Sequence, residues 1–135
     1  MKMSTQEEGY LAYQEARANE LEQSELILMM FSGGIHFLDR ALELAETDKI
    51  EMSKYVSKAK KVLLEIMSSL NIENSREMGE ILFKAYRGLF IKLNSAHIVD
   101  DTLKIKEVRD SLAELEDTWK QIFKSEEYTK FKMNR

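Results

Sequence analysis

The absence of proline is the feature that most constrains the fold of this chain. Its 135 residues include no proline and only five glycines. Strand-rich domains place such turn residues between strands roughly every 8–12 positions, and this chain lacks that punctuation. Good helix formers such as Glu, Leu, Lys, Ala and Met are abundant instead. The sequence therefore predicts an all-α fold.

Hydrophobic periodicity divides the chain into an N-terminal arm, four long helices and a tail. Linkers of only a few residues make sequential helices antiparallel, and a chain of this length is one domain. We therefore expect a single domain over residues 1–135, an antiparallel up-down-up-down four-helix bundle capped by an N-terminal arm or short helix. The expected ranges are 1–19 for the arm, 20–46, 50–70, 75–97 and 102–124 for the helices, and 125–135 for a frayed tail.

The first of these helices is apolar almost all the way round. Leu28, Ile35 and Leu42 recur every seven residues on the side opposite its main apolar stripe. Its polar residues are confined to a sector of about 100°, whereas a bundle helix needs only one apolar face of about that width. The first helix thus carries more apolar surface than a bundle requires.

The third helix shows the same excess, with an apolar arc of about 200°. Phe83 and Phe90 lie on one flank of it, and Ile91 points away from the core side. The second and fourth helices have plain apolar faces of about 140° and 100°. The surplus surface on the first and third helices indicates a binding surface for an apolar partner.

Two tyrosines in the arm have no position of their own in a bundle. We expect Tyr10 and Tyr13 to dock on the spare apolar surface. An arm held by a few side chains is easily displaced. Either this arm or the fourth helix should cover part of the surface at rest.

Charge and composition exclude several classes of function. The net charge is −4 with no basic block, which argues against nucleic acid and anionic membranes as partners. Every apolar run is shorter than the roughly 20 residues that span a membrane, so no membrane insertion is expected. The first eight residues do not resemble a signal peptide. The absence of cysteine excludes disulfides and thiolate metal sites.

Catalytic chemistry has few candidate residues. His36 and His97 lack the Glu three positions earlier that di-iron bundles use. We expect His36 to be a surface residue and His97 to favour the helix dipole as a cation. No glycine-rich phosphate loop is present, and Gly33–Gly34 lies mid-helix, where it predicts close helix packing or the approach of a partner's backbone. The sequence predicts no enzyme, no metal and no cofactor.

Four motifs in order are similar to those of the flagellar secretion chaperones, the FliS family. An arm with Tyr10 and Tyr13 precedes Leu26–Gly33, which resembles the pattern L-x-x-M-L-Y/F-D-G. Ala85–His97 resembles L-Y-x-Y-x-x-x-x-L-x-x-A-N, and Thr118–Lys120 resembles A-W-K/R. The resemblance covers the chain from about residue 10 to residue 123.

The chain also departs from the family pattern. Leu21–Ser24 stands where the family has T-A-S-P, Ser32 replaces an Asp, Gly88 replaces the second Tyr of the third-helix motif, and His97 replaces an Asn. These departures leave the expected fold unchanged and bear on which partner is bound.

The resemblance implies a cytoplasmic chaperone without enzymatic activity. Such proteins bind the disordered C-terminal segment of newly made flagellin, prevent its premature polymerisation and help deliver it for export. The client folds into short helices in apolar grooves. Further partners implied by the family are the flagellar export apparatus and a co-chaperone.

The predicted partner-binding residues come from three arguments. The resemblance implies Tyr10 as the anchor of the arm, and the arm itself adds Tyr13. By motif position the resemblance also implies Leu26, Met30, Phe31 and Tyr86. The surplus helical surface adds Leu28, Ile35, Leu42, Phe83 and Phe90. The alternative is a structural or interaction bundle that uses the same apolar surface as a homodimer seam, although a monomer is favoured.

Overall fold

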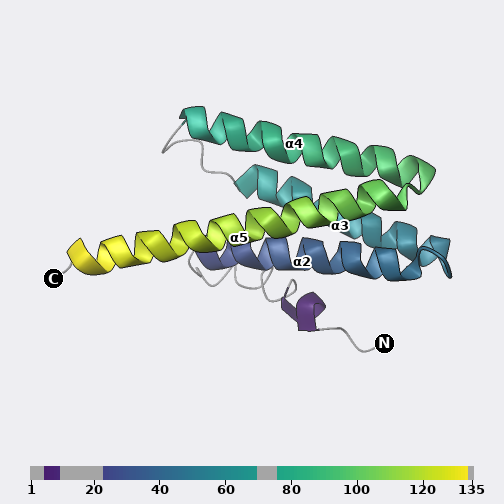
Figure 1. The fold of residues 1–135 in the computed structure, drawn as a ribbon, viewed down its shortest axis with the longest axis horizontal. Coiled ribbons are helices and arrows are strands. Elements are labelled where there is room, and N and C mark those ends of the chain that lie inside the picture. Colours follow the sequence, from purple (N-terminus) through teal and green to yellow (C-terminus); the bar gives the residue numbers. More distant parts are fainter. Residues whose placement is uncertain (1–4, 10–22, 70–75, 134–135) are drawn as a thin grey trace.

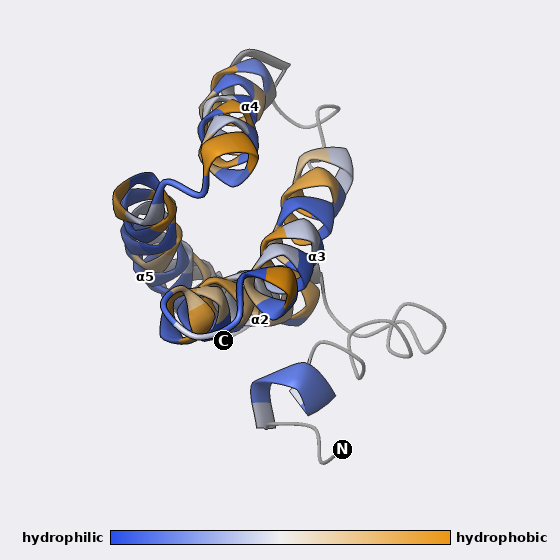
Figure 2. Cartoon of the chain, turned by 90° about the vertical axis from the view of Figure 1, so that its right-hand side faces the viewer, coloured by the Kyte–Doolittle hydropathy of each residue, from blue (hydrophilic) through white to orange (hydrophobic). Residues whose placement is uncertain are grey.

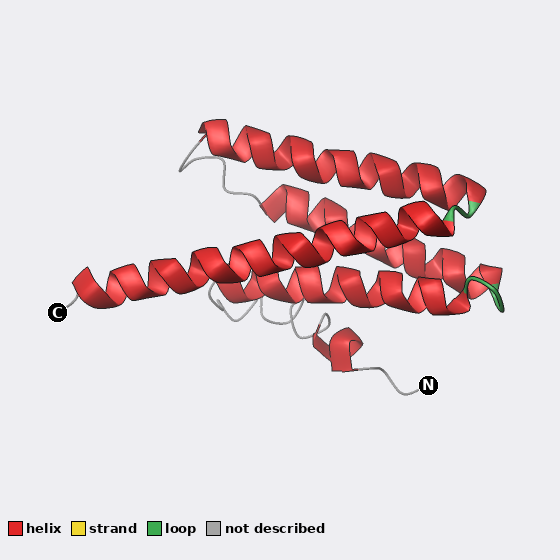
Figure 3. Ribbon diagram, viewed as in Figure 1, coloured by secondary structure: helices red, strands yellow, loops and turns green. Residues whose placement is uncertain are grey.

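The computed structural model describes residues 5–9, 23–69 and 76–133, and this part of the chain is helical apart from two short turns (Figures 1 and 3). A short helix over residues 5–9 precedes four long ones. These are α2 (Gln23–Leu44), α3 (Lys49–Ser69), α4 (Arg76–Val99) and α5 (Thr102–Met133).

The four long helices form the predicted antiparallel bundle. α2 packs against α3 and α5, and α4 packs against the same two helices. Among the described residues the backbones of α2 and α4 lie too far apart to pack directly, as do those of α3 and α5, although the Tyr86 ring reaches Phe31 across the core. The end-on view in Figure 2 shows the resulting ring, with α4 opposite α2. The all-α, up-down-up-down fold class is therefore confirmed.

Aspartates at the two described turns start the helices that follow. The backbone N–H of Glu51 donates to Asp48 Oδ1 at 3.1 Å, and that of Lys104 donates to Asp101 Oδ1 at 3.2 Å. Both are N-cap bonds that satisfy an otherwise unpaired amide of the first turn. Asp100 has a φ of 52°, a left-handed conformation that Asp tolerates better than most residues.

The core lies between the four helices and receives side chains from each. Seven residues of the apolar face predicted for α3 are buried, from Met52 to Ile66. Gly34 of α2 faces the core, where an added Cβ would be in van der Waals contact with Val62 Cγ1 at 3.4 Å and Leu112 Cδ1 at 3.6 Å. The largest fully buried side chains are Tyr86, Phe31, Met30, Leu38, Met52, Leu63, Ile66, Leu93, Ile105 and Leu112.

The last helix is longer than predicted. We expected it to end near residue 124 and the tail to fray, but α5 continues to Met133. The tail contains no Pro or Gly that would stop a helix, and it is rich in Glu and Lys. The polarity of residues 125–133 therefore did not mark the end of the helix.

Candidate functional site

An apolar strip with exposed side chains runs along the line where α3 meets α4. Two hydrogen bonds mark this line, Ser53 Oγ to His97 Nε2 at 2.7 Å and Lys60 Nζ to Asn94 Oδ1 at 3.1 Å. Residues seven or four positions away on a helix lie on the same side as these bonded groups.

By this spacing three apolar residues continue the line beyond the hydrogen bonds. Phe90 and Phe83 lie seven and fourteen residues before His97, and Leu64 lies four residues after Lys60. Leu64 is 48% exposed and Phe83 is 38% exposed, while Phe90 is half-buried. We call Leu64, Phe83 and Phe90 the α3–α4 apolar strip.

A rigid aromatic cluster lies beside this strip, within the bundle. The ring of Tyr86 is fully buried and lies 6.1 Å from that of Phe31. Trp119 Nε1 donates a 2.6 Å hydrogen bond to the Tyr86 hydroxyl. Burial raises the pKa of Tyr86, the bond from Trp119 opposing it, so the phenol stays neutral at physiological pH. These contacts connect α2, α4 and α5.

The second apolar side of α2 is only partly covered. Leu28, Ile35 and Leu42 are all half-buried, and the last two pack against the core. Arg109 of α5 donates to Asp39 of α2 at 2.7 Å on this side. α5, the expected fourth helix, therefore lies beside this side of α2.

The predicted binding residues fall into three groups. Met30, Phe31 and Tyr86 are buried in the core, so at rest they support the surface rather than form it. Leu26, Leu28, Ile35, Leu42 and Phe90 are half-buried, and Phe83 is exposed. Tyr10 and Tyr13 lie outside the described residues. Partner binding by the whole set stays a prediction.

Leu64 belongs to the apolar strip but was missed in the sequence. A signal for it was present, because Leu64 is an apolar residue on the otherwise charged face of α3, beside Lys61 and Glu65. By helical spacing it lies on the same line as Phe83 and Phe90.

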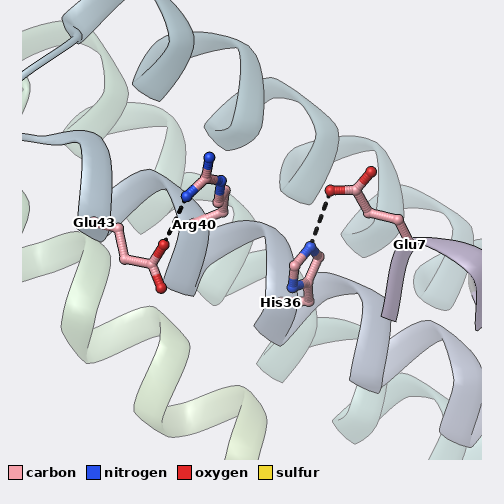
Figure 4. Close-up of polar contacts among 4 residues, drawn as sticks. All are labelled: Glu7, His36, Arg40 and Glu43. Atoms are coloured by element: carbon pink, nitrogen blue, oxygen red, sulfur yellow. Dashed lines mark hydrogen bonds and ion pairs between the residues drawn. The ribbon is translucent and has the colours of Figure 1, made fainter. Parts of the chain in front are cut away.

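The short N-terminal helix is held against α2 by a polar contact. Glu7 Oε1 lies 3.2 Å from His36 Nε2, and Figure 4 shows this pair beside the Arg40–Glu43 ion pair of α2. The side chain of His36 is only 13% exposed. The expectation of a surface histidine was wrong, because residues 5–9 approach α2 at this position.

His97 also differs from its expected role. Desolvation, together with the nearby Lys60 charge, lowers its pKa below 6.5. The ring is therefore neutral at pH 7 and bonds to Ser53 rather than serving the dipole of α4 as a cation.

The described residues contain no group of three His, Cys, Asp or Glu side chains placed to hold a metal ion. None of the helices in this part of the chain is long and apolar enough to span a membrane. This part of the chain therefore presents exposed apolar residues above a buried hydrophobic core.

Comparison with known proteins gives consistent matches. The family model of flagellar protein FliS matches residues 6–126. The flagellar secretion chaperone FliS of Bacillus subtilis (strain 168) is 33% identical over 120 residues, which cover 87% of each chain. The flagellar secretion chaperone FliS of Campylobacter jejuni subsp. jejuni serotype O:6 is 25% identical over 119 residues, covering 87% of this chain and 93% of the relative.

Proposed function

This chain belongs to the flagellar protein FliS family, and from that premise we propose that it is a cytoplasmic export chaperone for flagellin. It binds the disordered C-terminal segment of flagellin stoichiometrically, keeps that segment from polymerising early and hands it to the export apparatus. The family match over residues 6–126 is the observation that carries this proposal. Chaperoning of this kind is binding and requires no catalytic group.

The α3–α4 apolar strip supports a helix-in-groove mode of binding. A disordered segment gains affinity by burying apolar side chains as it folds, which offsets the entropy lost on ordering. Phe83 and Leu64 expose apolar area that the bundle leaves uncovered. Aromatic residues of this kind are frequent anchors in interfaces.

The buried motif residues have a supporting part in this proposal. Met30, Phe31 and Tyr86 fix the backbones of α2 and α4, and the Trp119–Tyr86 hydrogen bond fixes α5 against α4. A preformed surface lowers the ordering cost of binding. Their conservative substitution would then weaken binding by loosening the surface.

Isothermal titration with a synthetic flagellin C-terminal peptide tests the proposal. We expect the wild type to bind one peptide per chain and Phe83→Asp to weaken binding by about tenfold or more, because a buried charge replaces an anchor. Ile50→Asp is the matched control, since Ile50 is 74% exposed at the other end of α3. Its affinity should equal that of the wild type.

Two results would contradict the proposal. An absence of binding by the wild type would reject the flagellin client, and equal binding by wild type and Phe83→Asp would reject the strip. Light scattering on the same samples separates the alternative, because a stable dimer unaffected by the peptide would indicate that the apolar surface is a homodimer seam.

A further inference from the structure

α4 carries a second uncovered face that points away from the bundle. Six of its residues recur at alternating spacings of three and four, the a and d positions of a heptad repeat, and all six are exposed. Three are isoleucines, with exposed fractions of 59% for Ile81, 54% for Ile91 and 76% for Ile98. We call this set the α4 outer seam: Ile81, Lys84, Gly88, Ile91, Ser95 and Ile98.

The seam is distinct from the surfaces described above. Tyr86, Leu93 and Ala96 face the core and are fully buried, and the α3–α4 apolar strip lies on the flank that meets α3. The short helix over residues 5–9 lies beyond α2, on the side of the bundle away from α4 (Figures 1 and 2). Nothing in the described part of the chain therefore covers the seam.

Gly88 has no explanation inside the bundle. Glycine within a helix is less stable than alanine, and a Cβ at Gly88 would have nothing within 4 Å. Gly34 differs, because a Cβ there would be in van der Waals contact with Val62 of α3 and Leu112 of α5. On the outer seam, Gly88 instead leaves a notch between Ile81 and Ile91 where another helix can come close.

The charges of the seam indicate the kind of helix that fits it. Lys84 on the seam and Arg87 beside it have no ion-pair partner among the described residues, although the whole chain has a net charge of −4. Lys92, on the other edge, pairs with Glu107 of α5 at 2.6 Å. A partner helix with acidic flanks would meet two free cations.

A second copy of this chain would not supply those acidic flanks. Parallel pairing of two α4 helices would place Lys84 against Lys84, and Arg87 near Lys92 of the other copy. Antiparallel pairing that stacks Ile81 on Ile98 would place Lys84 opposite Ser95, and Arg87 near Asn94. The charges therefore favour another protein over self-association.

We propose that the α4 outer seam docks an amphipathic helix of another protein, with aliphatic residues at heptad spacing and Asp or Glu on its flanks. This interaction is separate from flagellin binding and does not depend on it. The chain would hold its client on one flank of α4 while a second protein is bound on the outer face of the same helix.

Two designed peptides of about three heptads test the seam. Both carry Leu at a and d, one with Glu and the other with Lys at e and g, so that each repels itself and stays monomeric. Titration monitored by fluorescence anisotropy should show that the Glu peptide binds the wild type at least about tenfold more tightly than the Lys peptide. Ile91→Asp should lower Glu-peptide affinity by about tenfold or more, whereas the control Ile50→Asp should not.

Further variants separate docking from folding. Gly88→Ala should raise the melting temperature, because alanine favours the helix. It should also lower the affinity for the Glu peptide, because its methyl group fills the notch. Lys84→Glu combined with Arg87→Glu should reverse the preference to the Lys peptide. Flagellin-peptide binding by Ile91→Asp should be unchanged, so failure of this proposal is distinguishable from failure of the chaperone function.

Three outcomes would overturn the inference. Equal affinity for the two peptides would mean that the seam binds amphipathic helices non-specifically, without selection by charge. Unchanged Glu-peptide binding by Ile91→Asp would place the binding elsewhere. A wild-type dimer in sedimentation that Ile91→Asp dissociates would make a second copy the occupant.

Discussion

His97 couples the stability of the α3–α4 contact to pH. Its neutral ring bonds to Ser53, and desolvation lowers its pKa below the ordinary value of 6.5. The unfolded chain therefore binds the proton more tightly than the folded one. Neutral His97 therefore contributes fully to the free energy of unfolding above pH 6.5. This contribution is lost as the pH falls through the lowered pKa of the folded state.

The variant His97→Asn tests this coupling, because Asn can bond to Ser53 but does not titrate in this range. The wild type should lose more stability than His97→Asn between about pH 7.5 and pH 5.5. Urea unfolding at the two pH values measures the difference. An equal loss in both proteins would show that His97 is not the titrating group.

Tyr86 illustrates, at the same scale, why a motif residue need not touch a partner. Its hydroxyl accepts from Trp119 and its ring packs near Phe31, so three helices meet at one side chain. A buried polar group of this kind is costly unless it is bonded. Its identity is explained by packing and by one hydrogen bond, before any client is considered.

At the scale of the element, the two glycines of α2 and α4 allow a matched experiment. Gly34→Leu should destabilise the protein by about 1–3 kcal/mol, because Val62 and Leu112 already occupy the space. Gly88→Leu should stabilise it by up to about 1 kcal/mol, since its side chain enters open space and the helix propensity rises. Chemical denaturation of the two variants checks the sign of each change. Destabilisation of similar size at both sites would mean that α4 is covered in solution.

Helix periodicity predicted the elements well but not their contacts. The apolar face of α3 is a local feature, and the spacing of its residues in the sequence reveals it. The width of an apolar arc does not say which part of it meets a neighbouring helix. This is why Leu64 was overlooked.

Periodicity predicted neither where α5 ends nor that His36 is covered. α5 continues through a charged tail whose residues are intrinsically good helix formers. His36 is covered because a segment about 29 residues earlier in the chain approaches it. Contacts between distant segments leave no periodic signal in either segment.

At the scale of the whole molecule, α4 is held by fewer fully buried side chains than α3. It packs against α3 and α5, and Tyr86 brings it to Phe31 of α2. Its fully buried residues in the described part of the chain are Tyr86, Leu93 and Ala96, whereas α3 has seven buried residues along its length. Elements with few buried apolar contacts open locally at lower free energy than the rest of a fold. Both proposed binding surfaces include residues of this helix.

Hydrogen exchange should detect this difference in stability. Amides of residues 80–90 in α4 should exchange about tenfold faster or more than those of residues 52–66 in α3, because local opening of α4 disrupts fewer buried contacts. Adding the flagellin peptide should slow exchange at 80–90, where Phe83 and Phe90 lie, and Phe83→Asp should remove that protection. The α2–α3 turn should be unchanged and serves as an internal control. Uniform exchange across α3 and α4 would mean that the bundle opens as one unit, and the client would then have to bind a surface that is already rigid.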